Sequence, residues 1–512
     1  MDYLLGIDLG TQGVRCALFN LEGRLAATAA RAFRTSHPRP MWAEQDPETW
    51  WQATVAALRE TMERAAVPPA AVRALSYDCA SCNVVALDSE GRPLRPALLW
   101  MDERAHEAAA ALTRLGSPHF RYCGGSLSPQ WMLPKARWLK DHEPDTYARA
   151  AWLVEATDLL TYRLTGEWTA SLDNATAKWN YVRPLGGWPL DVLKAGGLEE
   201  LPDKWPRRVL PVGSVVGLLH PAVADATGLT PATLVAQGGI DAHAGMIGLG
   251  AIDAGDLALI VGSSTCHMAL TSAPVFADIW GPYPDAVADG AFLLEGGQTA
   301  TGSVVQWLLT LTGLAPEDAE GRARALAALE CEARHLPPGA QGLLVLDHFQ
   351  GNRTPHKDPH ARGALIGLTL GHSRAHLLRG VYEGVAFGTR AVLENLATHG
   401  FGLRRLVAGG GGSRSPLWMQ IHADVLSRPI ELPETPEPMA LGAAIWAGLA
   451  AGCFRDYREA VRRMVRVRDV VAPVVAVRPA YDVHYARYQE AYERLRDLER
   501  RTAYASRDPL SP

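Results

Sequence analysis

The chain has 512 residues, of which 48% are hydrophobic and 21% charged, and a formal net charge of −5. This length exceeds what one hydrophobic core supports, and the composition is typical of a soluble globular protein, so we expect two domains. The acidic balance and the lack of a Lys/Arg tract exclude nucleic acids and anionic membranes as expected partners. Seven scattered cysteines, and a start at Met1-Asp2-Tyr3 without a basic segment, favour a reduced, cytoplasmic protein.

The first predicted element is a hairpin. An apolar run over residues 4–9 is interrupted by Asp8, and a second apolar run follows over residues 16–19. Four small or polar residues form the turn between them: Gly10, Thr11, Gln12 and Gly13. A carboxylate at the end of a buried strand is costly unless it binds a cation or a hydrogen-bond donor. Asp8 beside this donor-rich turn therefore suits the phosphates of a magnesium nucleotide, although an ordinary hairpin is the alternative for this turn alone.

The next segments continue the first domain. Residues 24–33 read as a third strand, which completes an antiparallel meander. Asp46 followed by Pro47 predicts the start of a helix that runs to Ala65. A strand is expected over residues 74–77, and residues 105–230 read as mostly helical.

Asp241 is the predicted catalytic base. A strand over residues 235–237 breaks at Gly238 and Gly239, and Asp241 follows near the middle of the chain, where two halves must meet. Phosphoryl transfer to a hydroxyl needs a carboxylate within hydrogen-bond reach of that hydroxyl. The alternative is a helix N-cap aspartate, which is compatible with catalysis but does not require it. Neighbouring His243 has no second His or Cys at metal-ligand spacing, so we expect it to be structural.

A second hairpin appears half a chain later. An apolar strand over residues 257–261 runs into Gly262-Ser263-Ser264-Thr265 and resumes over residues 266–270. Two hairpins of the phosphate-binding kind in successive halves indicate a duplicated fold with a nucleotide held between the halves. This pattern resembles the actin-like ATPase superfamily. We predict an N-terminal domain over residues 1–250, a C-terminal domain over 251–470 and a helical tail over 471–512.

The second half contains two further glycine-rich segments. Residues 295–302, from Glu295 to Gly302, open a predicted helix over 303–311. Four glycines at 409–412 lie between a strand and the strong helix start Ser415-Pro416, and such side-chain-free backbone makes a flat surface for adenine. The apolar helix expected over residues 440–453 is too short to span a bilayer and is predicted to be buried. Tyrosines at helical spacing over residues 481–492 are expected to pack on the body of the protein.

Together these segments resemble a known family. Six of them match, in order, the motifs of the FGGY carbohydrate kinases: residues 6–13, 238–241, 262–265, 295–298, 351–353 and 409–412. The resemblance covers the chain to about Val470. Details such as Tyr77 to Cys82 and Ala177-Lys178-Trp179 are similar to the ribulokinase and D-ribulokinase branch. The xylulokinase and glycerol kinase branches have a Gln-containing motif near Ala80 to Cys82, which this chain lacks.

The resemblance implies an α/β fold of two actin-like (ribonuclease H-like) ATPase domains flanking a catalytic cleft, with ATP and Mg²⁺ as cofactors. It implies that Asp8 holds Mg²⁺. The implied sugar-binding residues are Ser81, Lys178, Asp241 and Glu295. The implied nucleotide-binding residues are Gly10, Thr11, Gln12, Gly262, Ser264, Thr265, Gly302, Gly410, Gly411 and Gly412.

The resemblance further implies an ATP-dependent kinase that phosphorylates the terminal hydroxyl of a pentulose, with D-ribulose expected first. L-ribulose, D-xylulose, a pentitol such as ribitol and glycerol are the alternatives within the family. An actin-like ATPase without a sugar substrate is the alternative from another class. The expected partners are the small-molecule sugar and ATP, with no nucleic acid and no membrane, and a homodimer is kept as one oligomeric alternative.

Overall fold

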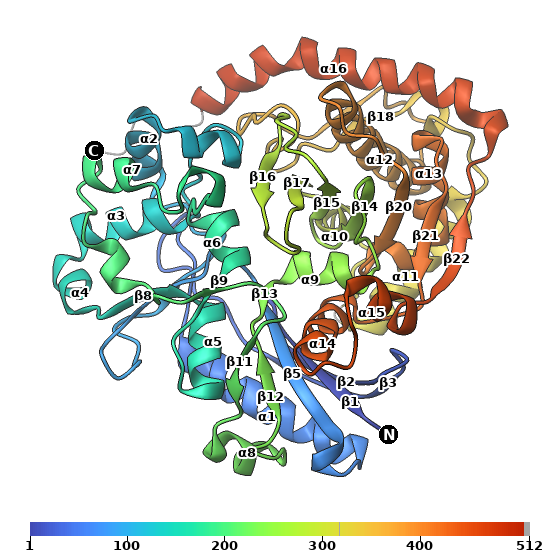
Figure 1. Cartoon of the computed structure of the whole chain (residues 1–512). Helices are drawn as coiled ribbons and strands as arrows, with labels where there is room; N and C mark the ends of the chain where they lie inside the picture. Colours follow the sequence, from blue (N-terminus) through green and yellow to red (C-terminus); the bar gives the residue numbers. More distant parts are fainter. Residues whose placement is uncertain (317, 506–512) are drawn as a thin grey trace.

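The computed structural model describes residues 1–316 and 318–505 as two large sheets with helices around and between them (Figure 1). The first, seven-stranded sheet has the order β11 (Val215–Leu218), β12 (Leu234–Ala236), β5 (Val72–Cys79), β1 (Tyr3–Leu9), β2 (Gly13–Asn20) and β3 (Leu25–Ala32), with β13 (Gly239–Ile240) also paired to β5. The second has the order β16 (Trp280–Pro284), β17 (Phe292–Gln298), β15 (Thr265–Thr271), β14 (Asp256–Val261), β20 (Arg405–Gly409), β21 (Ile430–Pro433) and β22 (Val467–Val471). The duplicated fold expected from the two hairpins thus consists of two large sheets, each with antiparallel and parallel pairs.

Helices surround both sheets. In the N-terminal half they are α1 (Pro47–Ala65), α2 (His106–Arg114), α3 (Met132–His142), α4 (Pro144–Arg149), α5 (Ala156–Thr165), α6 (Leu172–Lys178), α7 (Leu190–Ala195), α8 (Pro221–Thr227) and α9 (Asp241–Gly248). In the C-terminal half they are α10 (Gly302–Leu311), α11 (Ala319–Ala333), α12 (Arg374–Thr398), α13 (Pro416–Leu426), α14 (Pro438–Ala450), α15 (Tyr457–Met464) and α16 (Arg478–Ala505).

Three small sheets complete the described part of the fold. They are β4 (Glu44–Gln45), β7 (Ala97–Leu98), β6 (Val84–Leu87) and β8 (Trp152–Glu155); β9 (Ala170–Ser171) with β10 (Val209–Leu210); and β18 (Leu344–Leu346) with β19 (Ala364–Ile366). The expectation that residues 105–230 are mostly helical missed β8, β9, β10 and β11, because strands of two to four residues are too short to show a periodicity of their own.

The meander and the first helix form as predicted. Strand β1 pairs antiparallel with β2, and β2 pairs antiparallel with β3. Asp46 caps α1 by accepting a hydrogen bond from the Glu48 N–H. The parallel pairing of β1 with β5 places Asp8 opposite Asp78. Two carboxylates therefore lie side by side near the C-terminal ends of these two central strands.

Strand β1 serves two hydrophobic cores because its side chains alternate between the faces of the sheet. Leu5, Ile7 and Leu9 belong to the core that includes α1, whereas Leu4 belongs to the core that includes α14. Helix α14 lies so close to β1 that a Cβ on Gly6 would fall 1.8 Å from the Ala440 carbonyl oxygen. Gly6 therefore permits the backbone of α14 to rest on the strand.

Helices α9 and α14 lie between the two sheets (Figure 1). Their side chains share one core with Ala258 and Ile260 of β14 and Met268 of β15. A Cβ on Gly442 of α14 would fall 1.8 Å from the Ala244 carbonyl oxygen of α9, so the two helices touch backbone to backbone. The buried helix expected over residues 440–453 is thus α14, and it joins the halves.

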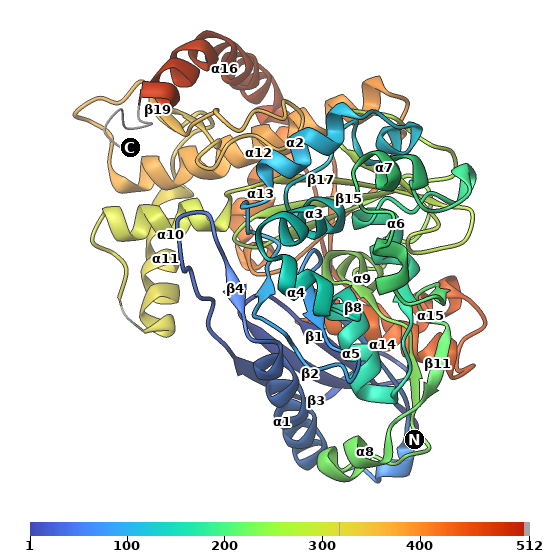
Figure 2. The ribbon, with the colours of Figure 1, turned by 90° about the vertical axis from the view of Figure 1, so that its left-hand side faces the viewer.

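The C-terminal helix α16 lies along the outer side of the C-terminal half (Figures 1 and 2). Tyr481, Tyr485, Tyr488 and Tyr492 are buried, and the first three join the core of that half. This confirms that the tyrosine stripe packs on the body of the protein. In the part of the chain that the structure describes, no helix is long and apolar enough to cross a membrane.

Candidate active site

A cavity of about 500 Å³ is lined by residues of both halves. It brings together all four predicted sugar-binding residues, Ser81, Lys178, Asp241 and Glu295, and three of the predicted phosphate-binding residues, Thr11, Gln12 and Ser264. Its walls also contain side chains to which the sequence reasoning assigned no role: Trp100, Met101, Gln130, Cys266, Trp280 and Arg353. Residues that are far apart in the sequence, from Thr11 to Arg353, thus surround one space.

Lys178 and Glu295 form the central ion pair of the cavity. Lys178 Nζ, at the end of α6, lies 2.6 Å from Glu295 Oε2 on β17. Lys178 is 1% exposed, which excludes a surface charge. Burial lowers the pKa of Lys178, but the Glu295 carboxylate outweighs this effect, and the pKa lies above its usual value. The pKa of Glu295 lies below its usual value because Lys178 outweighs burial, so both side chains are charged.

Asp241 is the first residue of α9, following the N-cap residue Ile240. Its carboxylate accepts a hydrogen bond from the Ala242 N–H at 2.7 Å. Burial, reinforced by the charge of Asp8, raises its pKa to about 7. A carboxyl group with this pKa can accept a proton at neutral pH.

Asp8 and Asp78 form an acidic pair beside Asp241. Burial raises the pKa of Asp8 to about 6 and that of Asp78 well above its usual value. No described residue donates a hydrogen bond to either Asp78 carboxyl oxygen. The protonated form of this buried carboxyl group is therefore favoured, and it can donate a hydrogen bond to Asp8. No role was predicted for Asp78 from the sequence, although two adjacent parallel strands that each have Asp as the penultimate residue would have signalled the pair.

These carboxylates fit Mg²⁺ without enclosing it. Among residues 1–316 and 318–505, no group of three or more His, Cys, Asp or Glu side chains could hold a metal ion by itself. Mg²⁺ commonly keeps several waters and binds one or two carboxylates together with substrate phosphates. The carboxylate oxygens of Asp8, next to an open turn, fit this mode of Mg²⁺ binding.

The two hairpin turns differ in how they hold their hydroxyl groups. In the first, Thr11 Oγ1 accepts a hydrogen bond from Trp100 Nε1 at 2.8 Å, while Gln12 is exposed. In the second, Thr265 is buried, and its hydroxyl donates to Thr301 Oγ1 at 3.0 Å. The Thr265 side chain is therefore not among those that line the cavity.

The predicted nucleotide glycines occupy three kinds of environment. Gly10 lies in the turn of the first hairpin, between β1 and β2. Gly302 packs on the turn of the second hairpin, where its N–H donates to the Gly262 carbonyl at 3.1 Å. Gly410 has φ +90° and Gly412 packs against Val261 and Trp418. Gly411 has φ −61°, and the nearest group to its Cβ position is Arg414 Nη2 at 3.9 Å, an ordinary contact with the end of a flexible side chain. Gly411 is thus the position at which an added side chain would protrude.

Buried polar side chains hold the Ser81 turn. Lys135 donates from Nζ to the carbonyl oxygens of Cys82 at 2.7 Å and of Leu99 at 2.6 Å. Glu155 accepts from the Cys82 N–H and from Trp179 Nε1, each at 2.7 Å. Cys82 has φ +63°, and this costly conformation is held by these bonds. Glu155 thus links the turn that carries Ser81 to the residue after Lys178.

Asp173 links α6 to the start of α9. Its carboxylate accepts from the Ile240 N–H at 2.9 Å and pairs with His243 Nδ1 at 2.6 Å. Both side chains are fully buried, so His243 has a structural partner and fixes the helix that begins at Asp241.

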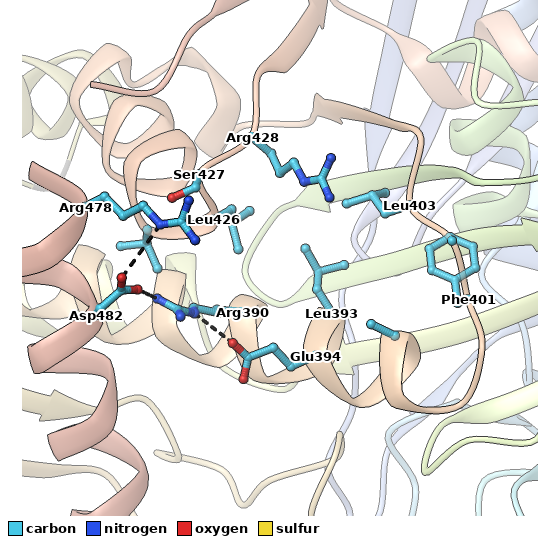
Figure 3. Close-up of a pocket in the computed structure, with 13 residues that line it drawn as sticks. Arg390, Leu393, Glu394, Phe401, Leu403, Leu426, Ser427, Arg428, Arg478 and Asp482 are labelled. Carbon is cyan, nitrogen blue, oxygen red and sulfur yellow. Dashed lines mark hydrogen bonds and ion pairs between the residues drawn. The ribbon is translucent and has the colours of Figure 1, made fainter. Parts of the chain in front are cut away.

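A second cavity, of about 530 Å³, lies between α12, α13 and α16 (Figure 3). Arg390 bonds Glu394 at 2.9 Å and Asp482 at 2.7 Å, so the carboxylates of this cavity are already paired with a cation. None of the predicted site residues lines this cavity. The predicted catalytic and sugar-binding residues therefore line the cavity between the halves and not this one.

The fold and the cavity between the halves define a two-domain sugar kinase. The models of the FGGY family of carbohydrate kinases match residues 3–248 with the N-terminal domain and residues 257–451 with the C-terminal domain, so the chain belongs to this family. FGGY kinases use ATP as the phosphate donor, and the protein is a sugar kinase.

Named relatives agree with this assignment. An FGGY carbohydrate kinase domain-containing protein of Xenopus laevis is 32% identical, over 94% of this chain and 95% of that protein. A ribulokinase of Geobacillus thermodenitrificans is 30% identical, over 96% of this chain and 94% of that protein. The solved xylulose kinase of Rhodospirillum rubrum superimposes with a TM-score of 0.85 at 29% identity, covering 97% of this chain and all of that one.

Proposed function

We propose that the protein transfers the γ-phosphoryl group of ATP to the terminal hydroxyl of D-ribulose, giving D-ribulose 5-phosphate. The observation that carries this proposal is the Lys178–Glu295 pair facing the same cavity as Asp241. A ketopentose offers a carbonyl oxygen to a cation and several hydroxyls to carboxylate acceptors. The small polar side chain of Ser81 lines the same cavity. At this position, Ala80 to Cys82, the chain lacks the Gln-containing motif of the xylulokinase and glycerol kinase branches.

In the proposed reaction Asp241 is the general base. The terminal hydroxyl oxygen of the sugar forms a bond to the γ-phosphorus, and the bond from that phosphorus to the β,γ-bridging oxygen breaks. The bridging oxygen keeps the electron pair and leaves as part of ADP, while the hydroxyl proton passes to the Asp241 carboxylate.

The remaining residues orient the reactants. Lys178 donates to the sugar carbonyl, and Glu295 accepts from a sugar hydroxyl. The backbone and hydroxyls of residues 10–13 and 262–264 bind phosphate oxygens, and Gly410 to Gly412 face the adenosine. Asp8 holds Mg²⁺, which when bound neutralises phosphate charge.

The test is an ADP-release assay with a panel of D-ribulose, L-ribulose, D-xylulose, ribitol and glycerol. The proposal predicts sugar-dependent ADP release with the highest kcat/KM for D-ribulose. Sugar-independent ADP release would instead indicate an ATPase. D-xylulose is the second candidate substrate, because the 29% identical relative with a TM-score of 0.85 is a xylulose kinase.

A further inference from the structure

Arg353 is a cation without an ionic partner in the active-site cavity of the described chain. Two cationic side chains line this cavity there, Lys178 and Arg353. Lys178 is paired with Glu295 at 2.6 Å, but the Arg353 guanidinium makes no hydrogen bond or ion pair to any described residue. It lies instead against the ring of Trp280, whose centroid is 4.8 Å from the guanidinium carbon. The half-buried guanidinium can therefore still bind an anion.

The guanidinium lies between the sugar-binding strand and the second hairpin. A Cβ placed on Gly297 of β17 would lie 3.4 Å from Arg353 Nη1 and 3.2 Å from the carbonyl oxygen of Thr265, the first residue of β15. Glu295 is two residues before Gly297 on the same strand. Arg353 therefore lines the same cavity as Glu295 and as Ser264 of the second hairpin.

The loop that carries Arg353 is tied to the active-site strand on its inner side. The Gly297 N–H donates to Thr354 Oγ1 at 3.3 Å, and Thr299 Oγ1 donates to the Gly351 carbonyl at 3.0 Å. These bonds lie on either side of Arg353 in the sequence.

The same loop is tied to α16 on its outer side. Asp358 accepts from Tyr492 Oη at 3.1 Å and from Arg500 Nη2 at 3.0 Å. The ring of His356 stacks on Tyr492 with centroids 4.1 Å apart. Helix α16 lies beyond the residues matched by the family models, which end at 451. Through these contacts the helix fixes a loop that reaches the cavity.

We propose that Arg353 is a catalytic residue whose guanidinium binds the oxygens of the phosphoryl group during its transfer, and that α16 positions it. A planar guanidinium with several N–H donors suits phosphoryl oxygens, and a fixed cation where charge develops accelerates such transfers. Arg353 itself forms and breaks no covalent bond. The inference rests on the sugar-kinase activity and not on which sugar is used.

The first test compares Arg353→Ala and Arg353→Lys with wild type, using whichever sugar the wild-type protein phosphorylates fastest. We expect kcat to fall by about 10²–10³ in Arg353→Ala and less in Arg353→Lys, with KM for sugar and ATP within about threefold. Guanidinium chloride at tens of millimolar should restore part of the Arg353→Ala rate, whereas equal sodium chloride should not. Arg324→Ala, on the exposed face of α11, is the matched control and should leave kcat unchanged.

An unchanged kcat, or a loss confined to KM for the sugar, would overturn the catalytic role. Loss of kcat without guanidinium rescue, in a variant with a lowered melting temperature, would also overturn it. If wild type prefers a sugar other than D-ribulose, only the substrate assignment fails.

The second test concerns α16. The double variant Tyr492→Phe/Arg500→Ala removes the two hydrogen bonds from α16 to Asp358. We expect kcat to fall about threefold to tenfold with KM unchanged. In the Arg353→Ala background the same two substitutions should lower kcat no further, because they act through Arg353. Full additivity of the two losses would overturn the positioning role. Arg494→Ala, on the exposed side of α16, is the control.

Discussion

The ammonium of Lys178 and the carboxylate of Glu295 meet at 2.6 Å, joining a helix of the N-terminal half to a strand of the C-terminal half. Both side chains are almost entirely buried, and both line the cavity that contains Asp241. The cavity proposed to bind the sugar is therefore complete only when the two halves are together. A kinase benefits from this arrangement because closure excludes water from the transferring phosphoryl group.

Lys178→Met keeps most of the stem and removes the charge. We expect a loss of roughly 1.5–3 kcal/mol in transition-state stabilisation for D-ribulose, as for a hydrogen bond to a charged group, and a smaller loss for ribitol, which has no carbonyl. The measurement is kcat/KM for both compounds in both proteins. Equal losses would remove the ketose argument, and no loss for either would remove Lys178 from the sugar site.

The same substitution also leaves Glu295 buried without its cation. Breaking a buried pair on one side costs about 3–5 kcal/mol, whereas replacing both partners costs much less. Lys178→Met should therefore melt at a lower temperature than wild type, and Lys178→Met/Glu295→Gln should recover much of the difference without recovering activity. A double variant as unstable as the single one would contradict this explanation.

Asp241→Asn tests the catalytic base. We expect sugar phosphorylation to fall by a factor on the order of 10² or more, while ATP still binds. In wild type, kcat/KM should decline toward acid with a midpoint near pH 7, because burial raises the pKa of Asp241 to about 7 and the base must be unprotonated. Near-normal turnover of Asp241→Asn would show that Asp241 is not the general base.

Ionisation of Asp241 should also lower the free energy of unfolding at alkaline pH. Its pKa is about 7 in the folded protein against an ordinary value of 3.8, so the folded state holds the proton more tightly than the unfolded state. The stability that this proton contributes is complete below about pH 4 and is lost as pH rises to about 7. Asn cannot ionise, so Asp241→Asn should gain a few degrees in Tm relative to wild type at pH 8 and little at pH 4.5. A pH-independent difference in Tm would contradict the raised pKa.

Gly411→Val tests the adenine surface. Gly411 has φ −61°, and its Cβ position is 3.9 Å from the flexible end of Arg414, so the variant should fold. The branched side chain should raise KM for ATP with little effect on the sugar. Gly410→Ala is the contrasting variant, because its φ of +90° and a contact of 2.6 Å with the Val261 carbonyl oxygen predict a lower melting temperature. An unchanged ATP affinity in folded Gly411→Val would count against the site.

Local chemistry made much of the fold predictable. Glycines 10 and 13, the cap at Asp46 and the helix start at Ser415-Pro416 act through neighbours in the sequence, and the hairpin, α1 and α13 begin as those signals indicate. The assembly of the cavity depends on contacts between distant segments. A single sequence carries no signal that Glu155 would hold the Cys82 turn or that Tyr492 would hold the Arg353 loop.

Predicted and missed site residues differ for the same reason. Lys178 and Glu295 were found through their resemblance to a family motif, and the structure brings them into one cavity with Asp241. Asp78 and Arg353 lie in segments that the sequence also singled out, but their significance depends on the register of β1 with β5 and on a long loop, which are not local properties. Their roles, like those of the predicted residues, await the variants described above.

A competition between sugars decides whether D-ribulose is the substrate. Equal concentrations of D-ribulose, L-ribulose, D-xylulose and ribitol are incubated with the protein and limiting ATP, and the phosphorylated products are identified by nuclear magnetic resonance. We predict that D-ribulose 5-phosphate predominates in wild type and is absent with Asp241→Asn. Predominance of another sugar phosphate, or consumption of ATP without any phosphorylated sugar, would contradict the proposed function.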